Sequence, residues 1–150
     1  MNLVPSLLGG LAGALTVTLV HELMKNTVED APRMDKLGME AIDESLDAAG
    51  QPSPSQPTLF KAAFAGELIS NTLYYELAGI GKRKTATRKG GLLGLAAGMG
   101  SIFLPKPLGL NSAHSNRTKK TQLLALGLYL LGGLVAAKVT AALDSAAEHD

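Results

Sequence analysis

The sequence contains no cysteine and no tryptophan, and aromatic residues make up only 4% of its 150 positions. Without cysteine, the chain forms no disulfide, binds no zinc or iron–sulfur cluster through thiolates, and offers no thiol nucleophile. Without tryptophan, an aromatic belt at a membrane surface depends on three tyrosines, Tyr74, Tyr75 and Tyr129. Packing between segments therefore relies on small and aliphatic side chains, chiefly leucine, alanine and 17 glycines.

A strong charge of either sign is also missing, because 14 Lys and Arg stand against 13 Asp and Glu, for a formal net charge of +1. No global field favours nucleic acid as a partner. The charged residues gather between long apolar stretches, and 46% of the chain is hydrophobic. This segregation is typical of a multi-span membrane protein. We therefore predict an all-α integral membrane bundle that forms a single membrane domain over residues 1–150.

Four apolar segments are predicted to be transmembrane helices, at about residues 3–24, 58–81, 90–104 and 121–143. The first gives roughly 33 Å of helix, enough to cross a hydrocarbon core of about 30 Å. A signal peptide is the alternative for it, but the start MNLVPSLL lacks a basic region. The third gives roughly 22 Å of helix before Pro105 and Pro107, so it is either a short, broken span or a re-entrant half-helix.

Small residues recur at helical spacing in three of these segments. Gly9 and Gly13 form a GxxxG pair in the first, and Gly132 and Gly133 precede alanines in the last. The third repeats glycine every four residues, at Gly90, Gly94 and Gly98, which is the pattern of a glycine zipper. Because small side chains let helix backbones approach closely in lipid, we predict that these glycines are helix-packing residues.

One carboxylate lies near the middle of the predicted 58–81 span. Placing Glu67 near the centre of a bilayer costs at least about 2.5 kcal/mol, so the side chain needs a protein environment. On a helix it shares one face with Ser70, Asn71 and Tyr74, and His21 on the first predicted helix is its candidate partner. Three interpretations stay open: a hydrogen-bonded packing site, a proton or ion site for transport, and a site for a lipid or quinone-like headgroup.

The polar segment 26–57 separates the first two predicted spans. Apolar and acidic residues alternate there at helical spacing, which predicts an amphipathic helix over about 33–49. Such a helix either lies on the membrane surface or caps the bundle, or it docks another protein. The spacer GQPSPSQP at 50–57 ends it, and Thr58 is the predicted N-cap of the following helix.

A basic cluster follows the second predicted span, with KRKTATRK at 82–89. Its five basic residues are predicted to contact lipid headgroups: Lys82, Arg83, Lys84, Arg88 and Lys89. A spanning third segment slightly favours both termini outside, whereas a re-entrant one favours the amino terminus inside, so the orientation stays open. The tail from Asp144 onward is expected to be solvated.

Sequence motifs of enzymes are missing. His21-Glu22 resembles the start of HExxH, but Lys25 occupies the second histidine position, which excludes a zincin site. The phosphate-binding pattern GxxxxGK[ST] and the nucleophile patterns Ser-x-x-Lys and Gly-x-Ser-x-Gly do not occur either. We therefore predict no catalytic residue, no metal and no cofactor. The expected partners are membrane lipids, further copies of the chain or a larger membrane complex, and not nucleic acid.

Two further stretches, APRMDKLGMEA at 31–41 and LPKPLGL at 104–110, complete the outline of a glycine-rich protein of four short spans. In this outline the chain resembles small, uncharacterised bacterial membrane proteins of the domain-of-unknown-function kind. The resemblance implies a location in the bacterial cytoplasmic (inner) membrane and no particular activity. The expected role is a non-enzymatic structural or accessory subunit. The alternative is a small transporter or channel that uses Glu67 with His21 and Asn71 as a proton or ion site.

Overall fold

A computed structural model describes residues 2–147, and these residues form α-helices, short turns and no strand. The prediction of an all-helical chain is therefore confirmed. Two 3₁₀ turns, η1 and η2, join α3 to α4. The elements in chain order are α1 Leu3–Thr27, α2 Met34–Ala48, α3 Gln56–Tyr75, η1 Glu76–Gly79, η2 Arg83–Thr85, α4 Ala86–Phe103, α5 Ala113–Asn116 and α6 Lys119–Ala147.

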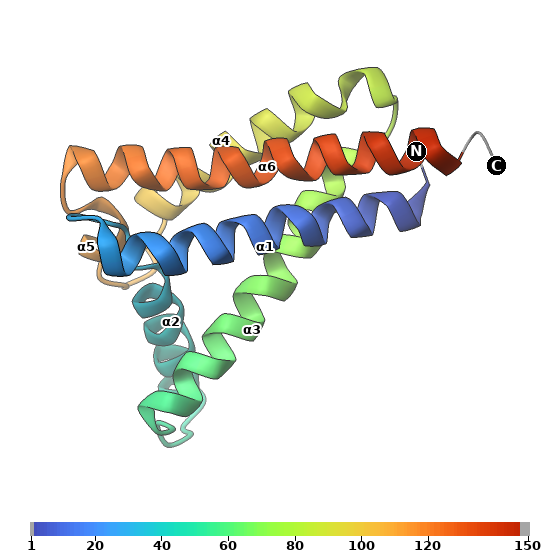
Figure 1. Ribbon diagram of the computed structural model, residues 1–150. Helices are drawn as coiled ribbons and strands as arrows, with labels where there is room; N and C mark the ends of the chain where they lie inside the picture. Colours follow the sequence, from blue (N-terminus) through green and yellow to red (C-terminus); the bar gives the residue numbers. More distant parts are fainter. Residues whose placement is uncertain (1, 148–150) are drawn as a thin grey trace.

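The two longest helices, α1 and α6, run antiparallel and side by side, so that the start of α1 and the end of α6 meet at one end of the molecule (Figure 1). Helix α4 packs along α6, also antiparallel to it. Helix α3 crosses α1 at a steep angle, and α2 and α3 together form a V-shaped arm below the long helices. This arm, residues 34–75, provides most of the candidate site described below.

Glycines make the contacts between the long helices very close. A Cβ added at Gly13 of α1 would lie 2.6 Å from the carbonyl oxygen of Gly132 on α6, and one at Gly9 would overlap Thr140. On α4, a Cβ at Gly98 would lie 2.9 Å from Leu126 Cα of α6. Gly90 and Gly133 face each other, and Gly94 faces the backbone of Tyr129 and Leu130. Backbone approach of this kind is available only where at least one of the two helices carries a glycine at the contact.

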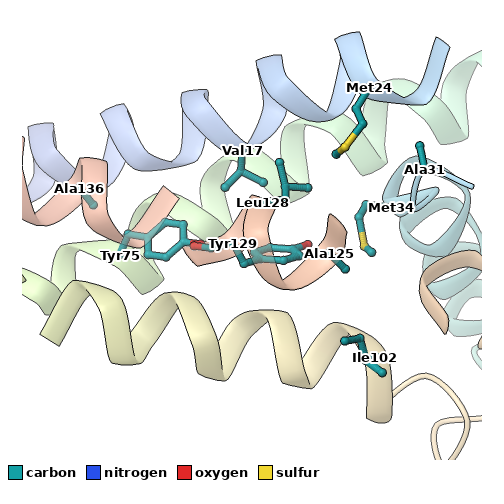
Figure 2. Close-up of a cluster of buried hydrophobic side chains, with 10 residues drawn as sticks. All are labelled: Val17, Met24, Ala31, Met34, Tyr75, Ile102, Ala125, Leu128, Tyr129 and Ala136. Atoms are coloured by element: carbon teal, nitrogen blue, oxygen red, sulfur yellow. The ribbon is translucent and has the colours of Figure 1, made fainter. Parts of the chain in front are cut away.

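Two tyrosines supply the large buried rings that this small-residue core otherwise lacks. Tyr75 is completely buried, and its hydroxyl donates a 2.7 Å hydrogen bond to the backbone carbonyl of Tyr129. Figure 2 shows both rings between α1 and α4, surrounded by aliphatic side chains such as Val17 and Leu128. The bond satisfies a polar hydroxyl that would otherwise be buried without a partner.

The outer surface of the long helices is apolar. On α1 every leucine lies on the outside, including Leu19 and Leu23, whose side chains are 62% and 69% exposed. The buried positions of the same helix are mostly small or polar, among them Gly9, Gly13 and Thr18. On this helix, large apolar side chains therefore lie on the surface, and mostly small ones face the interior.

Two helices among residues 2–147, α1 and α6, are long and apolar enough to cross a membrane. Helices α3 and α4 do not meet the same measure. The α-helix predicted to reach residue 81 ends at Tyr75, where η1 takes over, and Gly81 then turns the chain with a φ of +92°. Helix α3 also begins at Gln56 with Ser55 as its N-cap rather than Thr58, because Pro57 fits the first turn of a helix.

Helix α4 begins at Ala86, four residues before the predicted boundary at 90, and therefore includes Arg88 and Lys89. It runs unbroken to Phe103 along α6, without the break that was one of the expectations, and it ends before Pro105. The prediction that the tail from Asp144 onward is solvated was also wrong at Asp144. Asp144 is 3% exposed and accepts a 2.9 Å hydrogen bond from the backbone N–H of Asn2, while residues 148–150 lie outside the described residues.

Candidate functional site: a cavity beside a buried polar network

A cavity of about 710 Å³ lies between the α2–α3 arm and helix α4, with Tyr129 of α6 at its inner wall. Most of its lining is apolar, for example Leu37 of α2, Ala63 of α3 and Ala97 of α4. Leu104 and Leu108 also border it and are exposed, so the cavity opens on the surface of the protein. Its size falls within the range of small-molecule sites in proteins. The apolar face of the amphipathic helix α2 is thus turned toward this cavity.

The polar groups of the cavity come from one face of α3, the face that carries Glu67, Ser70, Asn71 and Tyr74. Because these residues share one face of the helix, as predicted, they lie together in the wall of the cavity. Glu67 Oε1 and Asn71 Nδ2 are both buried, and neither has a hydrogen-bond partner within the described residues. The two side chains, one helical turn apart, therefore do not satisfy each other. A buried acceptor and a buried donor are left available to a third group.

Ser70 and Tyr74 are already bonded to the protein. The exposed Ser70 donates its hydroxyl to the carbonyl of Glu67 at 3.2 Å, within its own helix. The Tyr74 hydroxyl donates a 2.8 Å hydrogen bond to the carbonyl of Leu93 and so ties α3 to α4. These two residues shape the cavity, whereas Glu67 and Asn71 bring the polar atoms without partners.

His21, the predicted partner of Glu67, is bonded elsewhere, and no hydrogen bond or ion pair joins the two among the described residues. The ring is 1% exposed, and its Nε2 lies 3.2 Å both from the backbone nitrogen of Met34 and from the carbonyl oxygen of Pro32. Its Nδ1 lies 3.9 Å from Glu22 Oε1. The α1–α2 turn folds back over His21 and brings these backbone groups, rather than Glu67, to Nε2.

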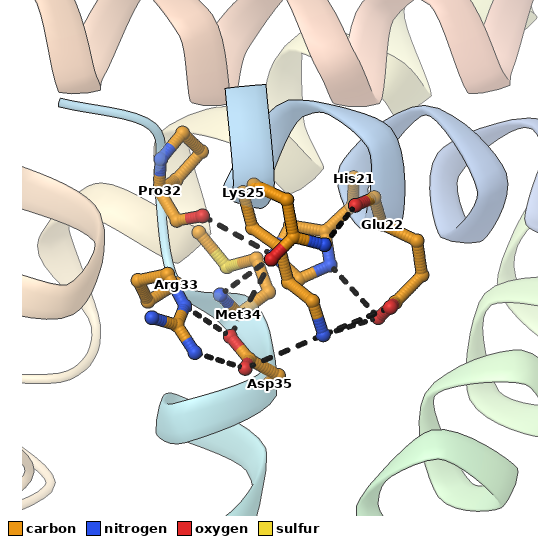
Figure 3. A network of polar contacts seen from close by, with 8 residues as sticks. His21, Glu22, Lys25, Pro32, Arg33, Met34 and Asp35 are labelled. Atoms are coloured by element: carbon orange, nitrogen blue, oxygen red, sulfur yellow. Dashed lines mark hydrogen bonds and ion pairs between the residues drawn. The ribbon is translucent and has the colours of Figure 1, made fainter. Parts of the chain in front are cut away.

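A network of ion pairs surrounds His21 and links α1 to the start of α2, as Figure 3 shows. Lys25 Nζ lies 2.8 Å from Glu22 Oε2 and 3.7 Å from Asp35 Oδ2. Arg33 holds the Asp35 carboxylate with two nitrogen atoms, at 2.9 and 2.6 Å. The two cations and two anions balance each other in charge. Glu67 borders a second, small cavity beside Glu22 and Asp35, so it stands in the wall between the large cavity and this network.

Asp35 is the most strongly held carboxylate of the network. Burial acts to raise its pKa, but the hydrogen bonds and positive charge of Arg33, helped by Lys25, overcome that effect and lower the pKa to about 2. The same hydrogen bonds raise the pKa of the Arg33 guanidinium. Asp35 therefore stays ionised, and it fixes the start of α2 against α1.

In the sequence, Asp35 is one of the acidic residues opposite the apolar face of the predicted amphipathic helix, and Tyr75 is one of the three tyrosines available for an aromatic belt. Both are buried in the structure. The signal for Asp35 was its position in the first turn of a helix, two residues after Arg33, where a carboxylate also interacts well with the helix dipole. Tyr75 lies about 40° beyond Asn71 at the edge of the polar face, and only the crossing of α3 over α1 turns it inward.

The basic cluster lies beside the termini, because η1, which precedes it, packs at Gly79 against Ser6 and Thr140. Lys82, Arg83, Lys84 and Arg88 are exposed. Lys89 donates a hydrogen bond to the carbonyl of Ile80, so its ammonium group also closes the turn between α3 and α4. Residues 2–147 contain no group of three or more His, Asp or Glu side chains able to hold a metal ion.

No protein-family model matches the sequence, and neither a curated protein nor a solved structure matches it. Evidence on function therefore comes from the chain's own surface, cavity and charges.

Proposed function

We propose that this chain is a multi-pass integral membrane protein of the bacterial cytoplasmic membrane with a non-enzymatic role, as a structural or accessory subunit. The observation that supports this proposal is the reversed distribution of side chains, with leucines outside and glycine, alanine, serine and threonine inside. In water, such a surface would cause aggregation. In lipid it is well solvated, and close packing of small residues then holds the helices together.

The proposal includes all four long helices of the bundle. Helices α3 and α4 are expected to lie in the membrane with α1 and α6, because their outward side chains are also large and apolar, for example Ile69, Leu73, Leu92 and Leu95. The predicted glycine zipper then serves contacts within one chain, since Gly90, Gly94 and Gly98 meet α6. A second copy or a larger complex would pack on the leucine surface, and the basic cluster would contact anionic headgroups.

Single-cysteine labelling tests the membrane placement directly, since the chain has no cysteine of its own. Leu19→Cys lies on the exposed outer face of α1, and Ser53→Cys lies in the polar loop between α2 and α3. In membrane fragments, where both faces are accessible, we expect a polar maleimide to label the Ser53→Cys variant and to leave Leu19→Cys unlabelled until detergent is added. Equal labelling of both cysteines before detergent would contradict a membrane location.

A second candidate function is transport, with Glu67 as a proton- or ion-binding group. The observation that favours it is that Glu67 lines a surface-open cavity and has no partner among residues 2–147, whereas a packing residue would be bonded. His21 would not take part, because its Nε2 contacts the backbone of Pro32 and Met34. In liposomes loaded with a pH-sensitive dye, a Glu67→Gln variant that assembles normally is expected to lose proton flux. Flux equal to that of the unchanged protein would rule out a relay through Glu67.

A further inference from the structure

The large cavity has the size and the walls of a binding site for an apolar molecule. Its volume of about 710 Å³ is enclosed by aliphatic side chains from α2, α3 and α4 and by the ring of Tyr129. An apolar molecule that filled it would gain from leaving water, or from replacing loosely packed lipid chains. Exposed Leu104 and Leu108 at the border give access from the outer surface, which is the lipid-facing surface in the proposed membrane placement.

The charges around the cavity leave one negative group without a counter-ion. Lys25 pairs with Glu22 and Asp35, and Arg33 pairs with Asp35, so that these four charges cancel. Glu67 stands next to this network but belongs to none of the ion pairs formed by the described residues. Two acidic residues of the network, Glu22 and Asp35, line the small cavity with it, and because both are paired with Lys25 or Arg33, Glu67 is the carboxylate of this wall left without an ion pair among the described residues.

The polar and aromatic groups at the same wall suit a cation. Two tyrosines, Tyr74 and Tyr129, line the cavity together with Glu67, and tyrosine rings attract positive charge through their faces. Asn71 adds a buried amide with an unused N–H donor, which suits an oxygen atom near the charged group. An anionic molecule would meet the Glu67 carboxylate with like charge, and a purely apolar one would leave both buried polar groups without partners.

We propose that this cavity binds a lipophilic cation, an amphiphilic amine whose apolar body fills the space between α2, α3 and α4 and whose ammonium group is balanced by the Glu67 carboxylate. The proposal deepens the transport candidate by naming a ligand class for the same residue, and it rests on that candidate for the role of Glu67. Binding does not require flux, and the two are measured separately.

The test uses the full chain in nanodiscs of zwitterionic lipid, at about pH 8, where a primary amine is protonated. Radiolabelled dodecylamine, dodecanol and dodecanoate are compared, because they share one apolar chain and differ in head charge. After subtraction of empty nanodiscs, we expect saturable binding of the amine only. Glu67→Gln, which keeps the shape of the side chain, should weaken amine binding by about tenfold or more. Glu76→Gln, which changes a carboxylate nine residues further along, in η1, that does not line the cavity, should leave amine binding unchanged.

A cavity-filling variant, Ala97→Phe, keeps the proposal testable if Glu67→Gln fails to fold, and it should abolish amine binding while helix content is retained. Saturable binding of dodecanol and dodecylamine alike, unaffected by Glu67→Gln, would assign the cavity to neutral lipid and overturn the proposal. Absence of saturable amine binding in the unchanged protein would also overturn it. If amine binding depends on Glu67 but liposomes show no proton flux, the transport function is contradicted, and the proposed ligand class stands.

Discussion

At the scale of single residues, the two carboxylates near the α1–α2 turn have opposite environments. Asp35 is paired with Arg33 and Lys25, whereas Glu67, which lines the small cavity beside Asp35, forms no ion pair with any of the described residues. The two carboxylates have different neighbours because the helix faces that carry them point in different directions, and not because one lies deeper in the protein than the other. A paired carboxylate fixes structure, and an unpaired one in a cavity wall is free to meet a ligand.

The lowered pKa of Asp35 predicts a pH dependence of stability. A carboxylate whose folded-state pKa is about 2, below its ordinary 3.8, stabilises the fold above about pH 4, and this contribution is lost as the pH falls toward 2. The free energy of unfolding should therefore fall by about 2 kcal/mol over that range through Asp35 alone. Detergent-solubilised protein, unfolded by SDS and followed by circular dichroism, allows the measurement.

Two variants on α2 isolate this effect. Asp35→Asn is expected to be destabilised at neutral pH and to lose the part of the acid dependence that arises between pH 4 and 2. Asp47→Asn, an exposed residue near the other end of the same helix, should follow the unchanged protein. If Asp35→Asn kept the full acid dependence, the Arg33 and Lys25 contacts would not be what stabilises the start of α2.

At the scale of helices, glycine placement decides which faces meet. Helix α6 lies between α1 and α4 and offers Gly132 to one and Gly133 to the other. Two neighbouring glycines on a helix point about 100° apart, so one short stretch can serve two partners. This geometry lets the middle of α6 pack closely against both helices.

A pair of glycine substitutions tests that packing. A Cβ at Gly94 would lie 2.5 Å from the carbonyl oxygen of Tyr129 and 2.7 Å from Leu130 Cα, so Gly94→Ala must push the backbones of α4 and α6 apart. We expect a loss of about 1–3 kcal/mol in the free energy of unfolding. Gly127 on α6 has nothing within 4 Å of such a Cβ, and Gly127→Ala should be neutral or gain up to about 1 kcal/mol. Equal effects of the two substitutions would contradict the close contact between α4 and α6.

At the scale of the whole molecule, the ends of the chain and the basic cluster share one end of the bundle. The N–H of Asn2 bonds to Asp144, and η1, just before the cluster, packs on Ser6 and Thr140. The opposite end holds the α1–α2 turn and α5, where Arg117 pairs with Asp30 at 2.9 Å. In the proposed membrane placement, an even number of crossings would therefore separate the start of α1 from the end of α6.

Topology reporters test this arrangement. Alkaline phosphatase or a fluorescent protein fused before residue 1 and after residue 150 should report the same side of the membrane for both ends. A Lys84→Cys variant should react with impermeant maleimide from that same side. Reporters on opposite sides would exclude the antiparallel pairing of α1 and α6 in the membrane. The result also gives the orientation, which the distribution of Lys and Arg leaves open.

The amino-acid sequence was enough to predict the helical class, the amphipathic segment that becomes α2, and the shared face of Glu67, Asn71 and Tyr74. These features are local, because helical periodicity and apolar runs depend on residues within a few turns of one another. It also singled out glycines that the structure places at helix crossings, though not which helix each one meets.

Which residues His21 and Glu67 contact depends on the tertiary structure. His21 was expected beside Glu67, but the return of the chain after α1 brought Met34 and Asp35 to its ring instead. The angle of α3 opened a cavity where a sealed helix pair was one of the expectations. Both outcomes depend on turns of a few residues and on crossing angles, which set distances between segments far apart in the chain. Local pattern carries no information about those distances, and so the sequence could place Glu67 on a face but not show what that face would meet.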